Sequence, residues 1–252
     1  AINKMQEMIA TCGEKPYMYR VIGYSQTEIG DSLNALKNMR LFFSKQPVER
    51  ILPSDYQYMG RIYMKLNRPD SADYFYEMAV MADTAGDKAE TYRANAEDFK
   101  ALKSDTGYAK AGEWYGRLVA ENPDVPALDY YYWGFWSYYG RNYETAAKAF
   151  EAFEAKYPDQ PSATYWRGRV AAAMDPEAKE GTAIPYYTKW LEIPNTENYI
   201  KKNADLMQAY QYLALYHYNN SNKAETTKYL DLITEIEPDN AFVKQVKEAM
   251  KK

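Results

Sequence analysis

The chain has 252 residues, a net charge of −4 and 46% hydrophobic residues, which is typical of a folded globular protein and not of a disordered one. The mildly acidic balance, with 31 Lys and Arg against 35 Asp and Glu, argues against a nucleic-acid partner, and no apolar stretch is long enough to form a transmembrane segment. A single histidine (His217) and a single cysteine (Cys12) exclude an intrachain disulfide and a metal site built from these residues, and no cofactor is expected.

Residues 1–14 predict one amphipathic helix, because Ile2, Met5 and Ile9 fall on a single helical face. We interpret this helix as the remnant second helix of a preceding repeat unit. A lipid anchor at Cys12 is not favoured, because polar residues interrupt the segment before it.

The rest of the chain repeats with a period of about 37 residues. Gly60 lies 37 residues after Gly23, and Gly134 lies 74 residues after Gly60. Each glycine follows a tyrosine by four residues and precedes an alanine by twelve. The alanines are Ala35, Ala72 and Ala146, and the large residues four positions after them are Met39, Tyr76 and Phe150.

Each repeat predicts two helices joined by a short turn, so the fold is expected to be all-α. Breaker residues place the turns at 30–31, 67–70, 105–107, 140–142 and 219–222, and an insertion lies around 175–181. The predicted array covers 15–252, with units over 15–45, 54–84, 88–123, 127–158, 162–194 and 203–238 and a capping helix over 239–252.

The units resemble the tetratricopeptide repeat (TPR) family. The second unit matches the family pattern best, with Tyr56, Gly60, Tyr63, Ala72 and Tyr76. The glycine and the alanine are expected where the two helices cross, since a larger residue would push the helix axes apart. The resemblance implies a right-handed α-α superhelix, or solenoid, of about six tandem helix pairs plus a C-terminal capping helix.

The run from Pro53 to Tyr56 is also similar to the tandem repeats of bacterial cell-envelope proteins. This similarity favours the bacterial periplasm or cell envelope over the cytoplasm as the location of the chain.

In this family, the first helix of each unit lines a concave groove, and residues between the packing positions face that groove. The corresponding residues here are rich in Tyr, Trp and Arg, which are enriched in binding hot spots. Packing inside the array is the alternative role for each tyrosine, and the third unit contributes no candidate because its register is open. The candidates are Tyr17, Arg20, Tyr24, Gln57, Tyr58, Arg61, Lys65, Tyr131, Tyr132, Phe135, Tyr138, Tyr165, Trp166, Arg169, Gln211, Tyr212 and Tyr218.

One variant of the family holds the C-terminal carboxylate of a peptide with Lys and Asn on successive first helices. The corresponding positions here carry Arg20, Tyr24 and Tyr58, so that particular clamp is absent. Arg20, Arg61 and Arg169 could instead meet an acidic partner through paired hydrogen bonds.

The expected function is a non-enzymatic scaffold that binds a partner protein or peptide in this aromatic groove. Carbohydrate binding in the same groove and a structural role as a spacer or oligomerisation array, including a homo-oligomer, are the alternatives. Phosphate-binding loops, nucleophile elbows and zinc-protease motifs are absent from the sequence. We interpret His217 as a packing residue, so no catalytic residue is expected.

Overall fold

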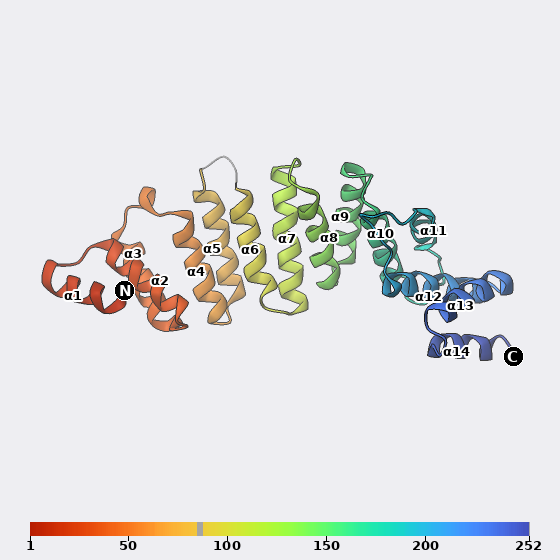
Figure 1. Cartoon of the computed structure of the whole chain (residues 1–252). Helices are drawn as coiled ribbons and strands as arrows, with labels where there is room; N and C mark the ends of the chain where they lie inside the picture. Colours follow the sequence, from red (N-terminus) through yellow and green to blue (C-terminus); the bar gives the residue numbers. More distant parts are fainter. Residues whose placement is uncertain (85–87, 252) are drawn as a thin grey trace. The chain divides into compact units, whose positions relative to one another are not determined.

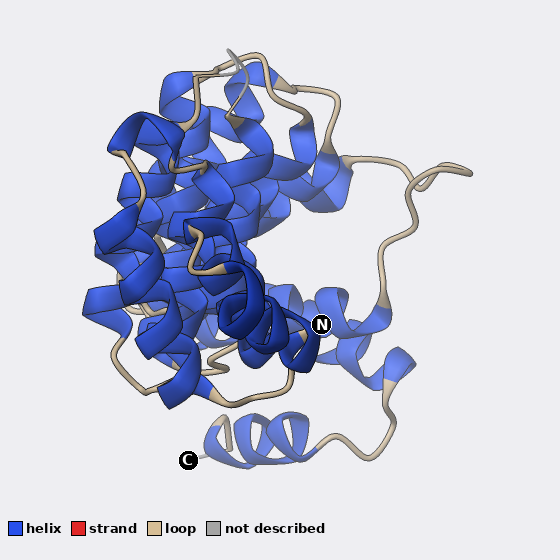
Figure 2. Ribbon diagram, turned by 90° about the vertical axis from the view of Figure 1, so that its left-hand side faces the viewer, coloured by secondary structure: helices blue, strands red, loops and turns tan. Residues whose placement is uncertain are grey.

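The computed structural model describes residues 1–84 and 88–251, and its regular structure there is helical (Figures 1 and 2). Fourteen α-helices and one short 3-10 helix, Val48–Arg50, follow one another within the described residues. The all-α prediction is therefore confirmed. No described helix combines the length and the hydropathy that a membrane crossing requires. The chain divides into two compact units, Ala1–Val125 and Pro126–Lys252.

The N-terminal unit is a series of helix pairs, in which α2 packs on α3, α4 on α5 and α6 on α7. Short connections of this kind place successive helices side by side. The first helix, α1, packs against α2. The helices are α1 (Ile2–Cys12), α2 (Pro16–Glu28), α3 (Ser32–Lys45), α4 (Pro53–Lys65), α5 (Pro69–Ala82), α6 (Ala89–Lys100) and α7 (Asp105–Glu121).

The C-terminal unit has the same organisation, with α8 packed on α9, α10 on α11 and α12 on α13. The last helix, α14, packs against α12 and α13 and falls inside the range predicted for the capping helix, of which Lys252 lies outside the described residues. The helices are α8 (Ala127–Tyr139), α9 (Tyr143–Lys156), α10 (Pro161–Met174), α11 (Ile184–Glu192), α12 (Asn203–Asn219), α13 (Lys223–Ile236) and α14 (Ala241–Ala249).

The turn inside most helix pairs contains one residue in the left-handed region of backbone space, with φ between 50° and 82°. Gly and Asn adopt this conformation readily, which explains the breaker residue at two of these turns, Gly30 and Asn67. The residues are Gly30, Asn67, Lys103, Arg141 and Ser221.

The turn predicted at 105–107 is wrong, because these residues form the first turn of α7. Ser104 caps the helix by accepting a hydrogen bond from the Gly107 amide over 3.1 Å. A Cβ on Gly107 would lie 2.7 Å from the Phe99 carbonyl oxygen. The glycine is therefore needed for the close approach of α6, and the turn itself lies at Lys103.

The repeat glycines lie where the two helices of a pair cross, as predicted. A Cβ on Gly60 would lie 2.3 Å from the Tyr76 ring, and one on Gly134 would lie 2.6 Å from the Phe150 ring. Both rings are fully buried. The large residue after each repeat alanine therefore occupies the space that the missing glycine side chain leaves. The residues at the alanine position are all buried: Ala35, Ala72, Ala111, Ala146, Ala183 and, in the last unit, Thr226.

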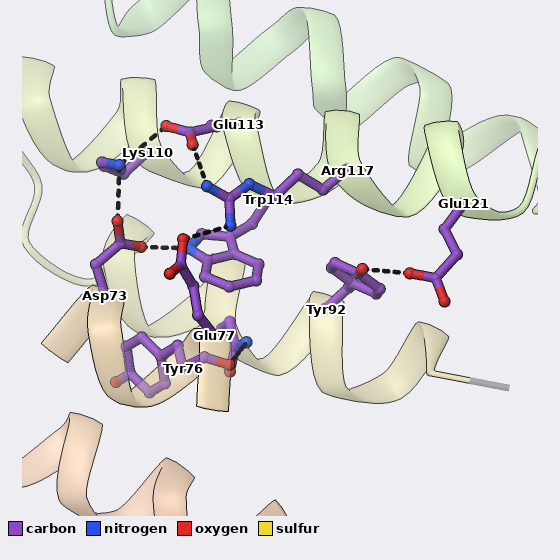
Figure 3. A network of polar contacts seen from close by, with 10 residues as sticks. Asp73, Tyr76, Glu77, Tyr92, Lys110, Glu113, Trp114, Arg117 and Glu121 are labelled. Atoms are coloured by element: carbon purple, nitrogen blue, oxygen red, sulfur yellow. Dashed lines mark hydrogen bonds and ion pairs between the residues drawn. The ribbon is translucent and has the colours of Figure 1, made fainter. Parts of the chain in front are cut away.

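Polar contacts tie successive second helices together in the N-terminal unit (Figure 3). Asp73 on α5 accepts a hydrogen bond from the Trp114 indole on α7 over 3.1 Å and pairs with Lys110 over 2.8 Å. One turn further along α5, Glu77 pairs with Arg117 over 3.0 Å. These contacts fix the position of α7 relative to α5 through side chains that are only partly exposed.

Glu154 has the equivalent role in the C-terminal unit, where it links α9 to α10 and α11. It accepts hydrogen bonds from Lys189 and Thr164, each over 2.8 Å, and from Arg167. Burial opposes the charged form of Glu154, but these hydrogen bonds outweigh burial and lower its pKa to about 2.

We expect Glu154→Gln to change how stability responds to acid. A carboxyl whose pKa is lower in the folded state stabilises the fold above its unfolded pKa of 4.5, and this contribution disappears as the pH falls toward about 2. The difference in urea midpoint between the wild type and Glu154→Gln should therefore shrink across this window. Glu151→Gln is the matched control, because Glu151 is exposed and lies 3.8 Å from Arg167. A pH-independent difference would contradict the assignment.

Candidate functional site

The candidate residues on α2 and α4 form a connected line of contacts. The Tyr24 and Tyr58 rings stack with centroids 3.5 Å apart. The Tyr24 hydroxyl donates to Asp55 Oδ1 over 2.7 Å, and Arg20 lies 3.7 Å from Asp55 Oδ2. Burial and the contact with Asp55 raise the pKa of Tyr24. Because Asp55 is fully buried and needs these partners, the line joins α2 to α4.

Arg61 is paired with a carboxylate on α6. Its Nε donates to Asp98 Oδ2 over 3.0 Å, and the Tyr76 hydroxyl donates to the same oxygen over 2.9 Å. Burial opposes the charged form of Arg61, but Asp98 outweighs burial and raises the pKa of Arg61. The remaining candidates of this unit are the partly buried Gln57 and the exposed Tyr17 and Lys65.

In the C-terminal unit, the aromatic candidates of α8 surround Trp166 on α10. The Trp166 ring stacks on Phe150 with centroids 5.4 Å apart, while the Tyr131, Phe135 and Tyr138 rings stand nearly perpendicular to it at 5.2 to 6.1 Å. Trp166 is only 7% exposed. The ring is therefore a packing residue between α8, α9 and α10, which corrects its assignment as a contact residue.

Two further candidates, Tyr165 and Tyr212, are buried as well. The Tyr165 hydroxyl donates to Asp205 on α12 over 2.8 Å, so this tyrosine joins α10 to α12. Its burial raises the pKa of Tyr165. The ring of Tyr132 stacks on Trp136 of the same helix, with centroids 6.3 Å apart.

Tyr212 anchors the insertion that the sequence places in the fifth unit. Its hydroxyl donates to Asp175 Oδ2 over 2.6 Å, and Asp175 also accepts hydrogen bonds from the amides of Lys179, Glu180 and Gly181. Burial and Asp175 raise the pKa of Tyr212 to about 12. The role of Tyr212 is therefore largely structural, although part of its surface reaches the cleft formed by the neighbouring first helices.

This cleft, of about 380 Å³, is the feature that brings several candidates together. We call it the C-terminal cleft. Its lining combines apolar side chains and aromatic rings with two glutamines and one arginine. It contains the candidates Tyr138, Arg169, Gln211 and Tyr212, together with Ala172, Ala173, Pro176, Tyr187, Gln208, Leu215 and Phe242.

Gln208 and Phe242 line the cleft but were not among the predicted candidates. Gln208 stands three residues before Gln211, so the helical period could have placed it on the same face. Phe242 comes from α14, and the repeat pattern contains no signal for how that helix packs. Tyr218 is partly buried and lies outside the cleft.

Arg169 is the cation of the C-terminal cleft. Its guanidinium donates to the hydroxyls of Tyr165 and Tyr138 over 3.1 and 3.2 Å and lies 5.1 Å from the Trp166 ring centroid. Within residues 1–84 and 88–251, Arg169 forms no ion pair with a carboxylate. The carboxylate of Asp205 accepts a hydrogen bond from the Tyr165 hydroxyl and not from Arg169. Burial opposes the charged form of Arg169, but the two tyrosines outweigh it and raise its pKa. A partly desolvated cation thus faces an open cleft.

Metal binding and the single histidine were the other features considered in the described part of the chain. No group of three or more His, Cys, Asp or Glu side chains in that part could hold a metal ion. His217 stacks on Tyr229 with ring centroids 5.8 Å apart, and burial lowers its pKa.

Comparison with solved structures identifies the fold. The chain is similar to the C-terminal part of a TPR repeat-containing protein from Cytophaga hutchinsonii, with 25% identity and a TM-score of 0.62 over 97% of this chain and 92% of that one. The chain thus has the tetratricopeptide repeat fold that its resemblance to this family implied. Neither a protein-family model nor a curated protein matches the sequence.

Two solved structures are more distantly similar to this chain. A tetratricopeptide repeat protein from Parabacteroides merdae is 12% identical with a TM-score of 0.44, over 100% of this chain and 91% of that one. PilF from Pseudomonas aeruginosa is 14% identical, also with a TM-score of 0.44, over 93% of this chain and 97% of that one. These two likenesses are too remote to add to the assignment.

Proposed function

We propose that this tetratricopeptide-repeat chain is a scaffold that binds an extended segment of a partner protein in the C-terminal cleft. The observation that carries the proposal is Arg169, a cation without a carboxylate partner in an aromatic-lined cleft. Arg20 and Arg61, in contrast, already pair with Asp55 and Asp98. An arginine left unpaired at a desolvated position gains most from an external acceptor.

The other side chains of the cleft suit a peptide. Gln208 and Gln211 can each donate and accept, which matches the donors and acceptors of an extended backbone. Leu215 and Phe242 supply apolar surface for a side chain of the ligand. The carbohydrate alternative loses one of its proposed stacking faces, because the Trp166 ring is buried.

Filling the cleft tests the proposal. Peptides selected from a random display library on the wild-type chain should bind Ala173→Trp at least about tenfold more weakly, a loss of about 1.4 kcal/mol. Ala173 lines the cleft and is partly exposed, so the new ring can occupy it without displacing the core.

Ala155→Trp is the matched control, because Ala155 is exposed on α9 and lies outside the cleft. Circular dichroism should show that both variants remain folded. If no peptide is enriched, or if the enriched peptides bind Ala173→Trp as well as Ala155→Trp, the proposed function is wrong.

A further inference from the structure

The two units of the chain contain the same three-residue arrangement. In the N-terminal unit it consists of Gly60, Arg61 and Tyr76. In the C-terminal unit the same repeat positions hold Gly168, Arg169 and Tyr187. A Cβ on Gly60 would lie 2.3 Å from the Tyr76 ring, and a Cβ on Gly168 would lie 2.6 Å from the Tyr187 ring. Each tyrosine therefore packs directly against its glycine, next to the arginine.

In the N-terminal unit, a carboxylate of the chain itself occupies this arrangement. Asp98 Oδ2 accepts hydrogen bonds from Arg61 Nε over 3.0 Å and from the Tyr76 hydroxyl over 2.9 Å. Asp98 stands on α6 two residues after Ala96, a buried residue that has the same place in α6 as Gly60 has in α4. The pair of an arginine and a tyrosine thus holds one carboxylate oxygen.

In the C-terminal unit, the chain supplies no such carboxylate. The glycine position of α12 is Ala214, and two residues later stands Tyr216 where α6 has Asp98. Tyr187 is 1% exposed and lines the C-terminal cleft, and its hydroxyl has no hydrogen-bond partner among the residues that the structure describes. Arg169 Nε likewise has no acceptor there.

The Tyr187 hydroxyl and the Arg169 guanidinium both line the cleft without a carboxylate acceptor, and one anionic group could accept hydrogen bonds from both. We propose that the C-terminal cleft binds a carboxylate group, which Arg169 and Tyr187 hold as Arg61 and Tyr76 hold Asp98. This inference rests on the proposed function, which makes the bearer of the carboxylate a peptide. The carboxylate is the C-terminus of the partner segment or an Asp or Glu side chain within it.

The direct probe is 3-phenylpropionate, with 3-phenylpropionamide as its neutral counterpart. Titration of the full chain should give a saturable shift of the Arg169 Nε–H resonance in ¹⁵N-edited NMR with the carboxylate only. Tyr187→Phe keeps the ring against Gly168 and removes the hydroxyl, so it should weaken binding about tenfold. Tyr186→Phe is the matched control and should bind as the wild type. Equal shifts with both probes, no saturable shift, or unchanged affinity in Tyr187→Phe would overturn the inference.

The N-terminal unit offers an independent test. Asp98→Ala should open the equivalent position, so that added acetate shifts the Arg61 Nε–H resonance in the variant and leaves it unchanged in the wild type. Because Asp98 is partly exposed, acetate can reach this position. No response of Arg61 to acetate in the folded variant would show that an arginine and a tyrosine at these positions do not suffice, and would overturn the inference.

Binding of modified peptides distinguishes a C-terminal carboxylate from an Asp or Glu side chain, and it also distinguishes this inference from the proposed function. A selected peptide that loses affinity on C-terminal amidation presents its terminus, and one that loses affinity on Glu→Gln or Asp→Asn presents a side chain. A peptide that depends on the cleft and ignores both changes overturns this inference alone. A chain that binds 3-phenylpropionate through Arg169 and selects no peptide overturns only the proposed function.

Discussion

Replacing Gly60 or Gly134 by alanine is expected to lower the free energy of unfolding by about 1–3 kcal/mol, although alanine is the better helix former by about 1 kcal/mol. The added methyl would lie 2.3 Å from Tyr76 and 2.6 Å from Phe150. Both rings are fully buried and cannot move aside without opening the contact between the two helices. Urea unfolding followed by circular dichroism measures the loss.

Gly23→Ala is the matched control for these variants. The new methyl would meet Met39 at 2.7 Å, but an unbranched methionine side chain can adjust. We expect a change close to zero, because the helix propensity of alanine offsets the small strain. Equal losses at all three glycines would show that backbone crossing, and not ring packing, sets the cost.

Trp166→Ala is expected to cost about 3–5 kcal/mol, the range for truncating a large core aromatic residue. The Trp166 ring packs between Phe150 and the aromatic side chains of α8, and Arg169 lies against it. Its removal would leave a cavity that these rigid rings cannot collapse to fill. Thermal or urea unfolding of the C-terminal unit, followed by the fluorescence of its other tryptophans, measures the effect.

Leu128→Ala on α8 is the control for Trp166→Ala, because Leu128 is 55% exposed and should contribute little. A loss for Trp166→Ala no larger than that for Leu128→Ala would mean that the indole is a surface contact. In that case, Trp166 would return to the list of ligand-binding candidates.

The fold was predictable because the crossing points of paired helices constrain residue size locally. Gly60 and Tyr76 stand in one helix pair, so a single period of the sequence contains both halves of the contact. The turn predicted at 105–107 is wrong for a different local reason. Gly107 is needed for its lack of a side chain beside Phe99 and not for a turn.

The candidate site was only partly predictable, because the state of each arginine depends on the next unit. Arg61 and Arg169 occupy the same repeat position, yet only Arg61 meets a carboxylate of the chain. That carboxylate, Asp98, lies in the third unit, whose register the sequence left open. The repeat pattern also identifies which face of a helix a residue occupies, but it does not indicate how deeply the side chain is buried. Trp166 was therefore expected on the surface.

An NMR shift map of the full chain with a selected peptide shows directly whether the C-terminal cleft binds it. We expect shifts concentrated on the cleft residues of α8, α10 and α12, with the Arg169 side chain among the largest. Two other pockets lie outside this cleft, one lined by Glu151, Met174 and Tyr186 and one lined by Arg61 and Asp98. Shifts confined to either of them would contradict binding in the C-terminal cleft.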